Sequence, residues 1–231
     1  VRALDGIDLE VAPGELLAVM GPSGSGKSTL LSIAGGLERP TRGHVYINGV
    51  DLAALDSVHR AEVRRRSIGY VFQDYNLIPS LSALENVEMP LQLDGVSPSK
   101  VREAAMAALE EVGVADLADR FPELLSGGQR QRIAIARALA PAPRVLIADE
   151  PVSALDMSTR ASVMDLLGSI TREWGMALVL VSHDLATVAS TCDRIAVMQQ
   201  GRIVEAGDTR PIMSAPRESY TRALIEAVPR L

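Results

Sequence analysis

The chain has 231 residues, of which 47% are apolar and 23% charged, as expected of a globular protein with a substantial core. Its net charge of −6 and sequence pI near 5.2 argue against a nucleic-acid-binding protein. The only cysteine, Cys192, cannot form an internal disulfide, which favours a reducing compartment, and we find neither a signal peptide nor the ~20-residue apolar run that spans a bilayer.

The N-terminal part is predicted to contain short strands around a glycine-rich loop. Apolar and acidic residues alternate over residues 7–11, which predicts a half-exposed antiparallel strand. The continuous apolar run 16–20 predicts a buried strand, and a helix is expected from about Lys27. A further strand over residues 44–47 should end at the hairpin turn Asn48-Gly49.

The middle of the chain is predicted to be mainly helical. A helix over residues 56–66 carries the one basic cluster, which Glu62 interrupts, so a solvated face is expected there. A strand over residues 68–72 follows, and helices separated by glycine and proline fill residues 74–140. One of these helices begins at Ser97-Pro98, a cap followed by proline at the first helical position. We expect residues 74–140 to form an α-helical subdomain.

The last third alternates buried strands with helices. Strands are expected over residues 145–150 and 177–181, with a helix over residues 158–174 between them. A hairpin should join strands 195–198 and 202–205, and an amphipathic tail should cover residues 220–228. Alternation of this kind predicts an α/β fold with a mainly parallel sheet covered on both faces. Residues 1–73 and 141–231 would then form one core, with an antiparallel β part near the N-terminus.

Residues 21–28, here called the phosphate loop, have the pattern G-x-x-x-x-G-K-[ST] between a predicted strand and a predicted helix. Glycines allow successive N–H groups to face one anion, and the helix dipole points to the same place. Lys27 and Lys100 are the only lysines among 23 basic residues, and a compact ammonium suits a phosphate site. A turn without a ligand is the weaker alternative. The expected nucleotide-binding residues are Gly21, Pro22, Ser23, Gly24, Ser25, Gly26, Lys27, Ser28 and Thr29.

Polar residues also end two other predicted strands. Asp149 and Glu150 end one, and His183 follows another. In open α/β sheets, ligands bind at the carboxyl ends of the strands. One carboxylate can hold Mg²⁺ while the other orients and deprotonates a water molecule. Each feature alone is more typical of a solvated loop, but behind a phosphate loop the functional interpretation is favoured.

A second glycine-rich segment, Leu125, Ser126, Gly127, Gly128 and Gln129, precedes a helix predicted from about residue 130 to residue 140. Its hydroxyl and N–H groups could bind a second anion in the same way as the first loop. By itself, the segment is also compatible with a simple helix cap containing two flexible glycines.

Taken together, these segments resemble the ATP-binding-cassette (ABC) ATPases across essentially the whole chain. No Asn-Lys-x-Asp motif for reading a guanine base is present. The family's motifs occur in order as the phosphate loop, the Q-loop glutamine Gln73, the signature segment 125–129, the Walker-B residues Asp149 and Glu150, the D-loop 153–156 and the switch histidine His183.

The resemblance implies a head-to-tail homodimer or pseudo-dimer, in which each ATP lies between the phosphate loop of one copy and the signature segment of the other. It assigns Ser28, Gln73 and Asp149 to Mg²⁺, and Lys27 to the transferring phosphoryl group. The catalytic base would be Glu150, with His183 on the γ-phosphate and Asp156 in contact with the other copy. The aromatic residue that stacks on adenine is expected upstream of Val1.

Different segments of the chain resemble two different classes of transporter ATPase. Residues 72–79 and 84–87 are similar to the lipoprotein-releasing and macrolide-exporter cassettes, whereas residues 150–156 and 219–224 are similar to oligopeptide-importer ATPases. We favour the exporter or mechanotransmission group, because the segment after Gln73 meets the permease in this family.

Tyr75, Leu77 and Glu85 are the predicted permease-coupling residues. The resemblance further implies a cytoplasmic protein held at the inner face of the membrane by transmembrane permease subunits. Soluble non-transport ABC ATPases are one alternative, but they usually carry coiled coils or a second cassette. A regulator that binds ATP without hydrolysis is another, and it conflicts with the intact Lys27, Glu150 and His183.

Overall fold

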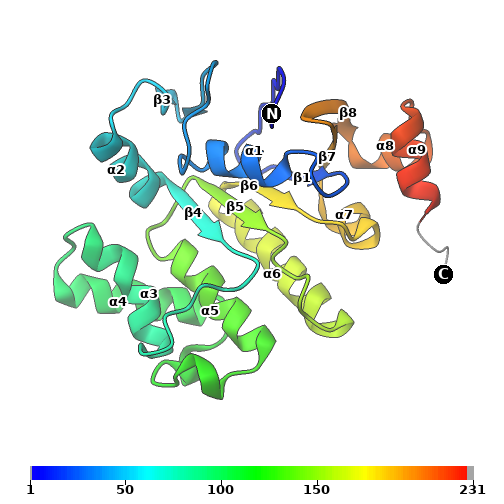
Figure 1. Ribbon diagram of the computed structural model, residues 1–231. Helices are drawn as coiled ribbons and strands as arrows, with labels where there is room; N and C mark the ends of the chain where they lie inside the picture. The colour runs from blue at the N-terminus through cyan, green and yellow to red at the C-terminus, as the bar shows by residue number, and fades with distance from the viewer. Residues whose placement is uncertain (1, 228–231) are drawn as a thin grey trace.

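The computed structural model describes residues 2–227 and is organised around one twisted six-stranded sheet (Figure 1). The strand order is β4-β5-β6-β1-β7-β8; all neighbours pair in parallel except β7 and β8, which are antiparallel. The strands are β1 Leu16–Met20, β4 Ile68–Val71, β5 Val145–Asp149, β6 Ala177–Val181, β7 Arg194–Gln199 and β8 Arg202–Asp208.

The central strand β1 is fully apolar because both of its faces are covered. Leu16 pairs with Leu178 of β6, and Leu17 pairs with Arg194 of β7. Successive side chains enter opposite cores: Leu16 belongs to one buried cluster and Val19 to the other. A strand buried on both sides has no polar alternation, which is why the run 16–20 could be recognised from its composition.

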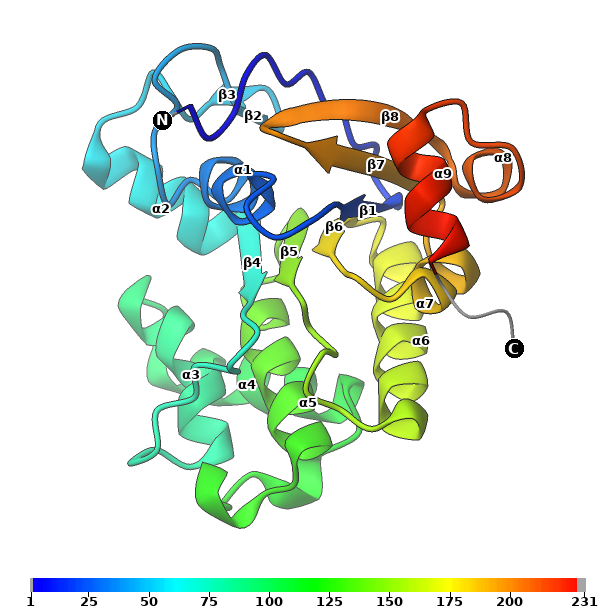
Figure 2. The same ribbon diagram turned by 45° about the vertical axis from the view of Figure 1, so that its right-hand side comes forward.

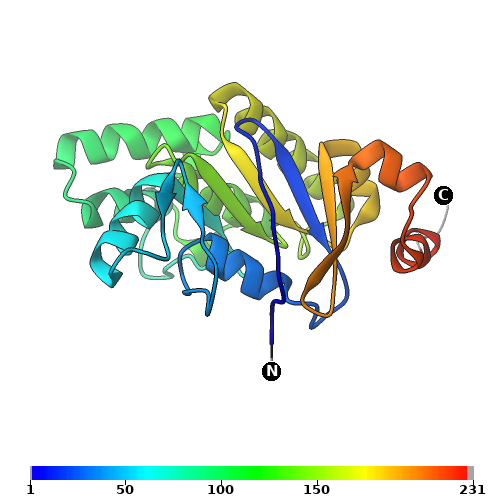
Figure 3. The ribbon, with the colours of Figure 1, turned by 90° about the horizontal axis from the view of Figure 1, so that it is seen from above.

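Each face of the sheet has its own helical cover. The first face packs against α5 Gly127–Leu139, α6 Met157–Trp174 and α7 Leu185–Thr191. The second face packs against α1 Lys27–Ala34 and the small hairpin of β2 Tyr46–Ile47 and β3 Val50–Asp51, with α2 Ser57–Ser67 beside them. Seen from above, α1 and α6 lie on opposite sides of the sheet (Figure 3).

Helices α3 Ala83–Leu93, α4 Pro98–Glu111 and α5 gather beyond the β4 edge, away from the hairpin (Figure 2). The short helices η1 Ala115–Leu117 and η2 Pro122–Leu124 connect α4 to α5. Apolar residues of α3 and α4 belong to the same buried cluster as β1 and β5. The helical content predicted for this region is therefore present, whereas its status as a separate subdomain stays a prediction.

One predicted strand is wrong. Residues 7–11 contain no strand, although Ile7, Leu9 and Val11 are half-buried and the acidic residues between them are exposed, as predicted. The carbonyl of Glu10 accepts a hydrogen bond from Arg194 Nη1 at 3.0 Å, so a side chain meets this extended segment. The antiparallel β part near the N-terminus is instead the β2–β3 hairpin, which turns at Asn48 and Gly49 with φ of 49° and 77°.

Several boundaries also differ from the sequence prediction. The strand expected over residues 44–47 is reduced to Tyr46–Ile47, and the helix expected from about residue 130 begins at Gly127. The helix α8 Thr209–Ser214 was not predicted. The tail forms α9 Ser219–Glu226, and Val228, the predicted end of the tail, lies outside the described residues. Within residues 2–227, no helix combines the length and apolar character needed to cross a membrane.

Candidate nucleotide site

The phosphate loop requires glycine at specific positions. Gly21, Gly24 and Gly26 have φ of 152°, 78° and 102°, values that residues with a Cβ rarely adopt. A Cβ on Gly21 would lie 2.2 Å from the carbonyl oxygen of Met198 in β7. A Cβ on Gly26 would lie 2.5 Å from the carbonyl oxygen of Ala3. The backbone thus passes tightly between neighbouring segments and turns directly into α1, as the motif predicts.

The interior of the loop contains polar groups suited to an anion. The Lys27 ammonium donates hydrogen bonds to the carbonyl oxygens of Gly21 and Pro22, both at 2.9 Å. Ser25 is 2% exposed, and its hydroxyl has no hydrogen-bond partner among the described residues. Buried hydroxyls are normally paired, so this one marks a place where a further acceptor fits. A phosphate group at the loop would offer oxygens to both side chains.

The strand ends bring opposite charges together in a partly buried place. Burial lowers the pKa of Lys27, and the nearby Glu150 and Asp149 partly oppose that shift. Burial raises the pKa of Asp149, Glu150 raises it further, and Lys27 acts in the opposite direction. Because β5, β6 and β1 are adjacent in the sheet, their carboxyl ends share one edge. The predicted convergence of Lys27, Asp149 and Glu150 is therefore present.

Glu150 and His183 form a close pair at this edge. His183 Nδ1 lies 3.3 Å from Glu150 Oε2, and the His183 side chain is 65% exposed. Glu150 has a φ of 47°, a conformation that is uncommon for a non-glycine residue and is often found at functional sites. Its N–H donates to the carbonyl of Val181 at 3.1 Å, which holds the residue against the end of β6.

A magnesium site would have to combine different ligand types. Among residues 2–227, no group of three or more His, Cys, Asp or Glu side chains is arranged to hold a metal ion. The predicted set of Ser28, Gln73 and Asp149 contains only one carboxylate. This suits Mg²⁺ in nucleotide sites, where water and phosphate oxygens complete the shell. Ser28 lies in α1, and the exposed Gln73 follows β4, two strands beyond β6 and three beyond β1.

The signature segment lies at the start of α5, in the helical region. Ser126 caps α5: its Oγ accepts from the N–H of Gln129 at 3.3 Å, and Gln129 Oε1 accepts from the N–H of Ser126 at 2.9 Å. Gly127 and Gly128 form the first turn of the helix, and Leu125 is buried. A Cβ on Gly128 would lie 2.5 Å from Thr159 Cγ2, so close packing against α6, rather than a flexible turn, requires glycine there.

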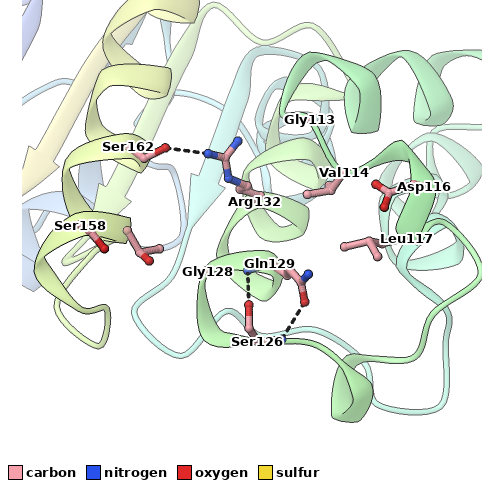
Figure 4. Close-up of a pocket in the computed structure, with 11 residues that line it drawn as sticks. Gly113, Val114, Asp116, Leu117, Ser126, Gly128, Gln129, Arg132, Ser158 and Ser162 are labelled. Atoms are coloured by element: carbon pink, nitrogen blue, oxygen red, sulfur yellow. Dashed lines mark hydrogen bonds between the residues drawn. The ribbon is translucent and has the colours of Figure 1, made fainter.

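A hollow of about 430 Å³ opens beside this segment between the start of α5, the start of α6 and the α4–η1 turn (Figure 4). Ser126, Gly128 and Gln129 line it, together with Ser158 and Ser162. Arg132 also lines the hollow, and it donates to Ser162 Oγ at 2.8 Å and to the carbonyl of Val112 at 2.6 Å. Within one chain, the start of α5 lies far from the phosphate loop at the start of α1 (Figure 2).

Two predicted residues also have structural roles. Asp156 caps α6, because its carboxylate accepts from the Thr159 N–H at 3.0 Å and from the hydroxyls of Ser158 and Thr159 at 2.7 and 2.8 Å. These hydrogen bonds hold the pKa of Asp156 well below its ordinary value. Glu85 completes a capping box at α3 by accepting from the N–H of Ser82 at 2.7 Å.

The other predicted coupling residues, Tyr75 and Leu77, are half-buried in the segment after Gln73. Tyr75 has a φ of 60°. Leu77 packs against the main buried cluster.

Arg160 was not predicted from the sequence. This residue donates to Asp184 Oδ2 at 2.8 Å and to the carbonyl of Leu155 at 3.2 Å. It thereby joins the D-loop to the residue after His183. Arg160 and Asp184 are 24 positions apart in the chain, so no local sequence pattern predicts their contact.

Comparison with known proteins identifies clear relatives. Residues 4–153 match the family model described as "ABC transporter". The chain is 44% identical to the methionine import ATP-binding protein MetN of Rhodopseudomonas palustris (strain BisB5), over 99% of this chain and 61% of that protein. It is also 44% identical to MetN 1 of Shouchella clausii (strain KSM-K16), over 99% of this chain and 66% of that protein. The chain therefore spans less than two thirds of the length of these curated relatives.

A solved structure matches the fold closely. The dimeric post-hydrolysis state of the ATP-binding cassette MJ0796, bound to ADP and Pi, aligns with a TM-score of 0.82 and 42% identity. The alignment covers 90% of this chain and 91% of that one.

Proposed function

The chain belongs to the ABC transporter family, and we propose that it is the ATP-hydrolysing subunit of an importer. The observation that carries the direction is its 44% identity over 99% of its length to a methionine import ATP-binding protein. This relationship favours the importer alternative over the exporter group suggested by residues 72–79. A methionine-type amino acid is the substrate class that the relatives support.

In the proposed mechanism, the phosphate loop binds the triphosphate of ATP. The ammonium of Lys27 exchanges its contacts with the carbonyls of Gly21 and Pro22 for phosphate oxygens, and the dipole of α1 favours the same charge. Ser28, Gln73 and Asp149 would hold Mg²⁺, which supplies positive charge that screens the phosphates when it is bound.

Glu150 is the proposed general base. It lies at the end of β5 with Asp149, and His183 Nδ1 is 3.3 Å from its carboxylate. A carboxylate held at this strand edge can accept a proton from water while the histidine orients the pair. The exposed His183 ring is also free to approach the γ-phosphate. Lys27 stabilises the charge that develops on the transferring phosphoryl group.

The second half of the nucleotide site comes from another copy of the chain. Ser126 and Gly128 line the 430 Å³ hollow, and the start of α5 lies far from the phosphate loop of the same chain. A head-to-tail dimer would bring them to the ATP of the partner copy, with Asp156 near the interface. The similarity to a dimeric cassette bound to ADP and Pi supports this arrangement.

Transport itself requires a membrane permease as partner. We expect coupling helices of that permease to contact Tyr75, Leu77 and the start of α3 near Glu85. This partnership would place the chain at the cytoplasmic face of the membrane. Purification from membranes, followed by vesicle assays with methionine, tests the direction: ATP-driven movement toward the cassette side supports import, and movement away from it contradicts import.

The catalytic assignment is tested with Glu150→Gln. We expect this variant to bind ATP, to lose hydrolysis by at least about a hundredfold, and to accumulate as an ATP-bound dimer in size-exclusion chromatography. Glu173→Gln, at an exposed position of α6, is the matched control. Hydrolysis at the wild-type rate in Glu150→Gln would exclude the general-base role.

A further inference from the structure

Two consecutive residues after the Q-loop glutamine have left-handed backbone conformations. Tyr75 has a φ of 60° and Asn76 a φ of 50°. Asparagine tolerates this region better than most residues, but tyrosine does not, and L-residues usually visit it singly. The local turn contributes two backbone hydrogen bonds, from Tyr75 to Phe72 at 3.3 Å and from Asn76 to Asp74 at 2.6 Å. An adjacent left-handed pair of this kind persists only where the surroundings hold it.

The side chain of Arg137, near the end of α5, binds both residues. Its Nη2 donates to the carbonyl of Tyr75 at 2.7 Å, and its Nη1 donates to the carbonyl of Asn76 at 2.5 Å. The planar guanidinium fork fits two neighbouring carbonyls, which the ammonium of lysine cannot bridge in the same way. These contacts join segments that are 61 and 62 positions apart in the chain.

The same helix also contacts the Tyr75 ring. The guanidinium of Arg130 lies over this ring, 5.5 Å from its centroid. At the first turn of α5, a Cβ on Gly127 would lie 3.4 Å from the Tyr75 hydroxyl. Residues 127, 130 and 137 are spaced by three and by seven positions, so they share one face of the helix. That face therefore runs from the signature segment to Arg137 along the segment after Gln73.

Because the Arg137 side chain is largely buried, its charge depends on these hydrogen bonds. Its desolvation lowers the pKa of the guanidinium, and the described residues provide carbonyl oxygens rather than a carboxylate as its partners. A buried cation must be hydrogen-bonded to be tolerated. The contacts are satisfied only while residues 75 and 76 keep their left-handed conformations, so the loop and the arginine hold each other.

We propose that Arg137 is a positioning residue that fixes the segment after Gln73 to α5, so that the loop carrying Gln73 and the helix carrying Ser126 move as one body. This inference rests on the proposed function, in which both residues act on ATP. Its consequence is that a displacement of Gln73 at one nucleotide is passed to the signature segment that faces the other. Ile133, Ala136 and Leu139 anchor α5 in the core independently of Arg137.

Hydrogen exchange of the nucleotide-free chain tests the contact directly. In Arg137→Lys, we expect exchange in residues 74–78 to be about tenfold faster, because hydrogen bonds to a charged group are lost, while exchange in the body of α5 is unchanged. Asn76→Ala should give the same local increase from the loop side, since alanine is less tolerant of a φ of 50°. Arg102→Lys, at an exposed position of α4, is the control. Unchanged exchange in both test variants would overturn the proposal.

ATP hydrolysis separates positioning from general destabilisation. We expect Arg137→Lys to lower kcat about tenfold while KM for ATP stays within about twofold, because the phosphate loop is intact. A parallel loss of thermal stability and of ATP affinity would contradict the positioning role. If the wild-type chain failed to hydrolyse ATP, the proposed function would fail, whereas the exchange experiment would still report on the contact itself.

Discussion

At the start of α1, the N-cap residue is Gly26, with a φ of 102° and no side-chain cap. At the start of α5, the N-cap is Ser126, and its hydroxyl forms a reciprocal capping box with Gln129. The glycines of the phosphate loop precede α1, whereas Gly127 and Gly128 form the first turn of α5. In the first, the N–H groups at the helix start are left for a ligand. In the second, the chain itself already satisfies two of them.

This difference suggests that the phosphate loop and the signature segment have different roles in nucleotide binding and catalysis. The phosphate loop is a preformed anion cradle, because its shape depends on backbone that is packed against Met198 and Ala3. The signature segment is a stable helix start that can be presented to another molecule without unfolding. An anion there can accept from the Ser126 hydroxyl, which only accepts in the capping box, and from the N–H groups that the box leaves unpaired. We therefore expect nucleotide affinity to depend mostly on the first segment and catalysis to depend on both.

The largest expected effect is at Gly21. In Gly21→Ala, the new Cβ would meet the carbonyl oxygen of Met198 at 2.2 Å, and a backbone atom cannot rotate away. We expect the free energy of unfolding to fall by about 3 kcal/mol and ATP binding to be lost. Urea denaturation and nucleotide titration measure the two effects.

Gly24→Ala is the matched control for Gly21→Ala. Gly24 also has a positive φ, 78°, but a Cβ there has no neighbour within 4 Å. Gly24→Ala should therefore lower the free energy of unfolding only by the backbone strain, about 1 kcal/mol. Equal losses in the two variants would contradict the tight packing inferred for the loop.

A smaller effect is expected at Gly128, where the clash involves a side chain. A Cβ would lie 2.5 Å from Thr159 Cγ2, so Gly128→Ala should reduce the free energy of unfolding by about 1–2 kcal/mol. Adding Thr159→Ser should recover most of this loss, because serine lacks the methyl group and keeps the hydroxyl that donates to Asp156.

Gly127→Ala provides the comparison for Gly128. Its Cβ would meet Tyr75 and Leu155 at 3.4 and 3.5 Å, which is ordinary contact. The helix propensity of alanine should then make this variant more stable by about 0.5–1 kcal/mol. A failure of Thr159→Ser to rescue Gly128→Ala would contradict the packing explanation for that glycine.

The fold and much of the site could be predicted from the sequence because their signals are local. A strand, three glycines, Lys27 and a helix follow one another without interruption, so the phosphate loop needs no long-range information. The convergence of Asp149 and Glu150 with Lys27 followed from a general rule of parallel sheets. The comparisons confirm the family and the α/β fold. The roles assigned to individual site residues stay predictions.

The missed features depend on partners distant in the chain. The segment 7–11 has the alternation of a strand, but no strand within residues 2–227 pairs with it. The glycine at position 128 reflects the nearby Thr159, and the carbonyls bound by Arg137 lie about 60 positions upstream. Residues 72–79 are similar to exporter cassettes, whereas the chain as a whole is 44% identical to a methionine import ATP-binding protein. Local patterns cannot contain such information.

The capping box of α5 also tests the comparison between the starts of α1 and α5, with a smaller expected effect on stability. Ser126→Ala should cost about 1 kcal/mol of stability, and it should also lower ATP hydrolysis if the hydroxyl contacts the nucleotide of the partner copy. Ser82→Ala removes the same type of box at the start of α3, where Ser82 pairs with Glu85. We expect a similar stability loss there without a loss of hydrolysis in the isolated chain. Thermal unfolding and phosphate release distinguish the two variants.

The smallest expected effect is a pH dependence at the start of α6, where Asp156 takes the place that glycine holds in α1. Hydrogen bonds from Thr159 and Ser158 hold the pKa of this carboxyl well below its ordinary value of 3.8. A lowered pKa means that the carboxylate stabilises the fold fully above that ordinary value, and that the contribution is lost as the pH falls below it. Asp156→Asn keeps an effective helix cap but does not titrate.

We therefore expect wild type and Asp156→Asn to differ most near neutral pH, with the wild type more stable, and the difference to shrink as the pH is lowered from about 6 toward about 2. Urea denaturation of both proteins across this range measures the effect, and the other carboxylates cancel because both proteins contain them. Curves that stay parallel throughout would mean that the Asp156 carboxylate contributes nothing beyond a neutral cap. In that case, Asp156 would resemble Ser126 at α5, and the charge at the start of α6 would be available to the dimer interface.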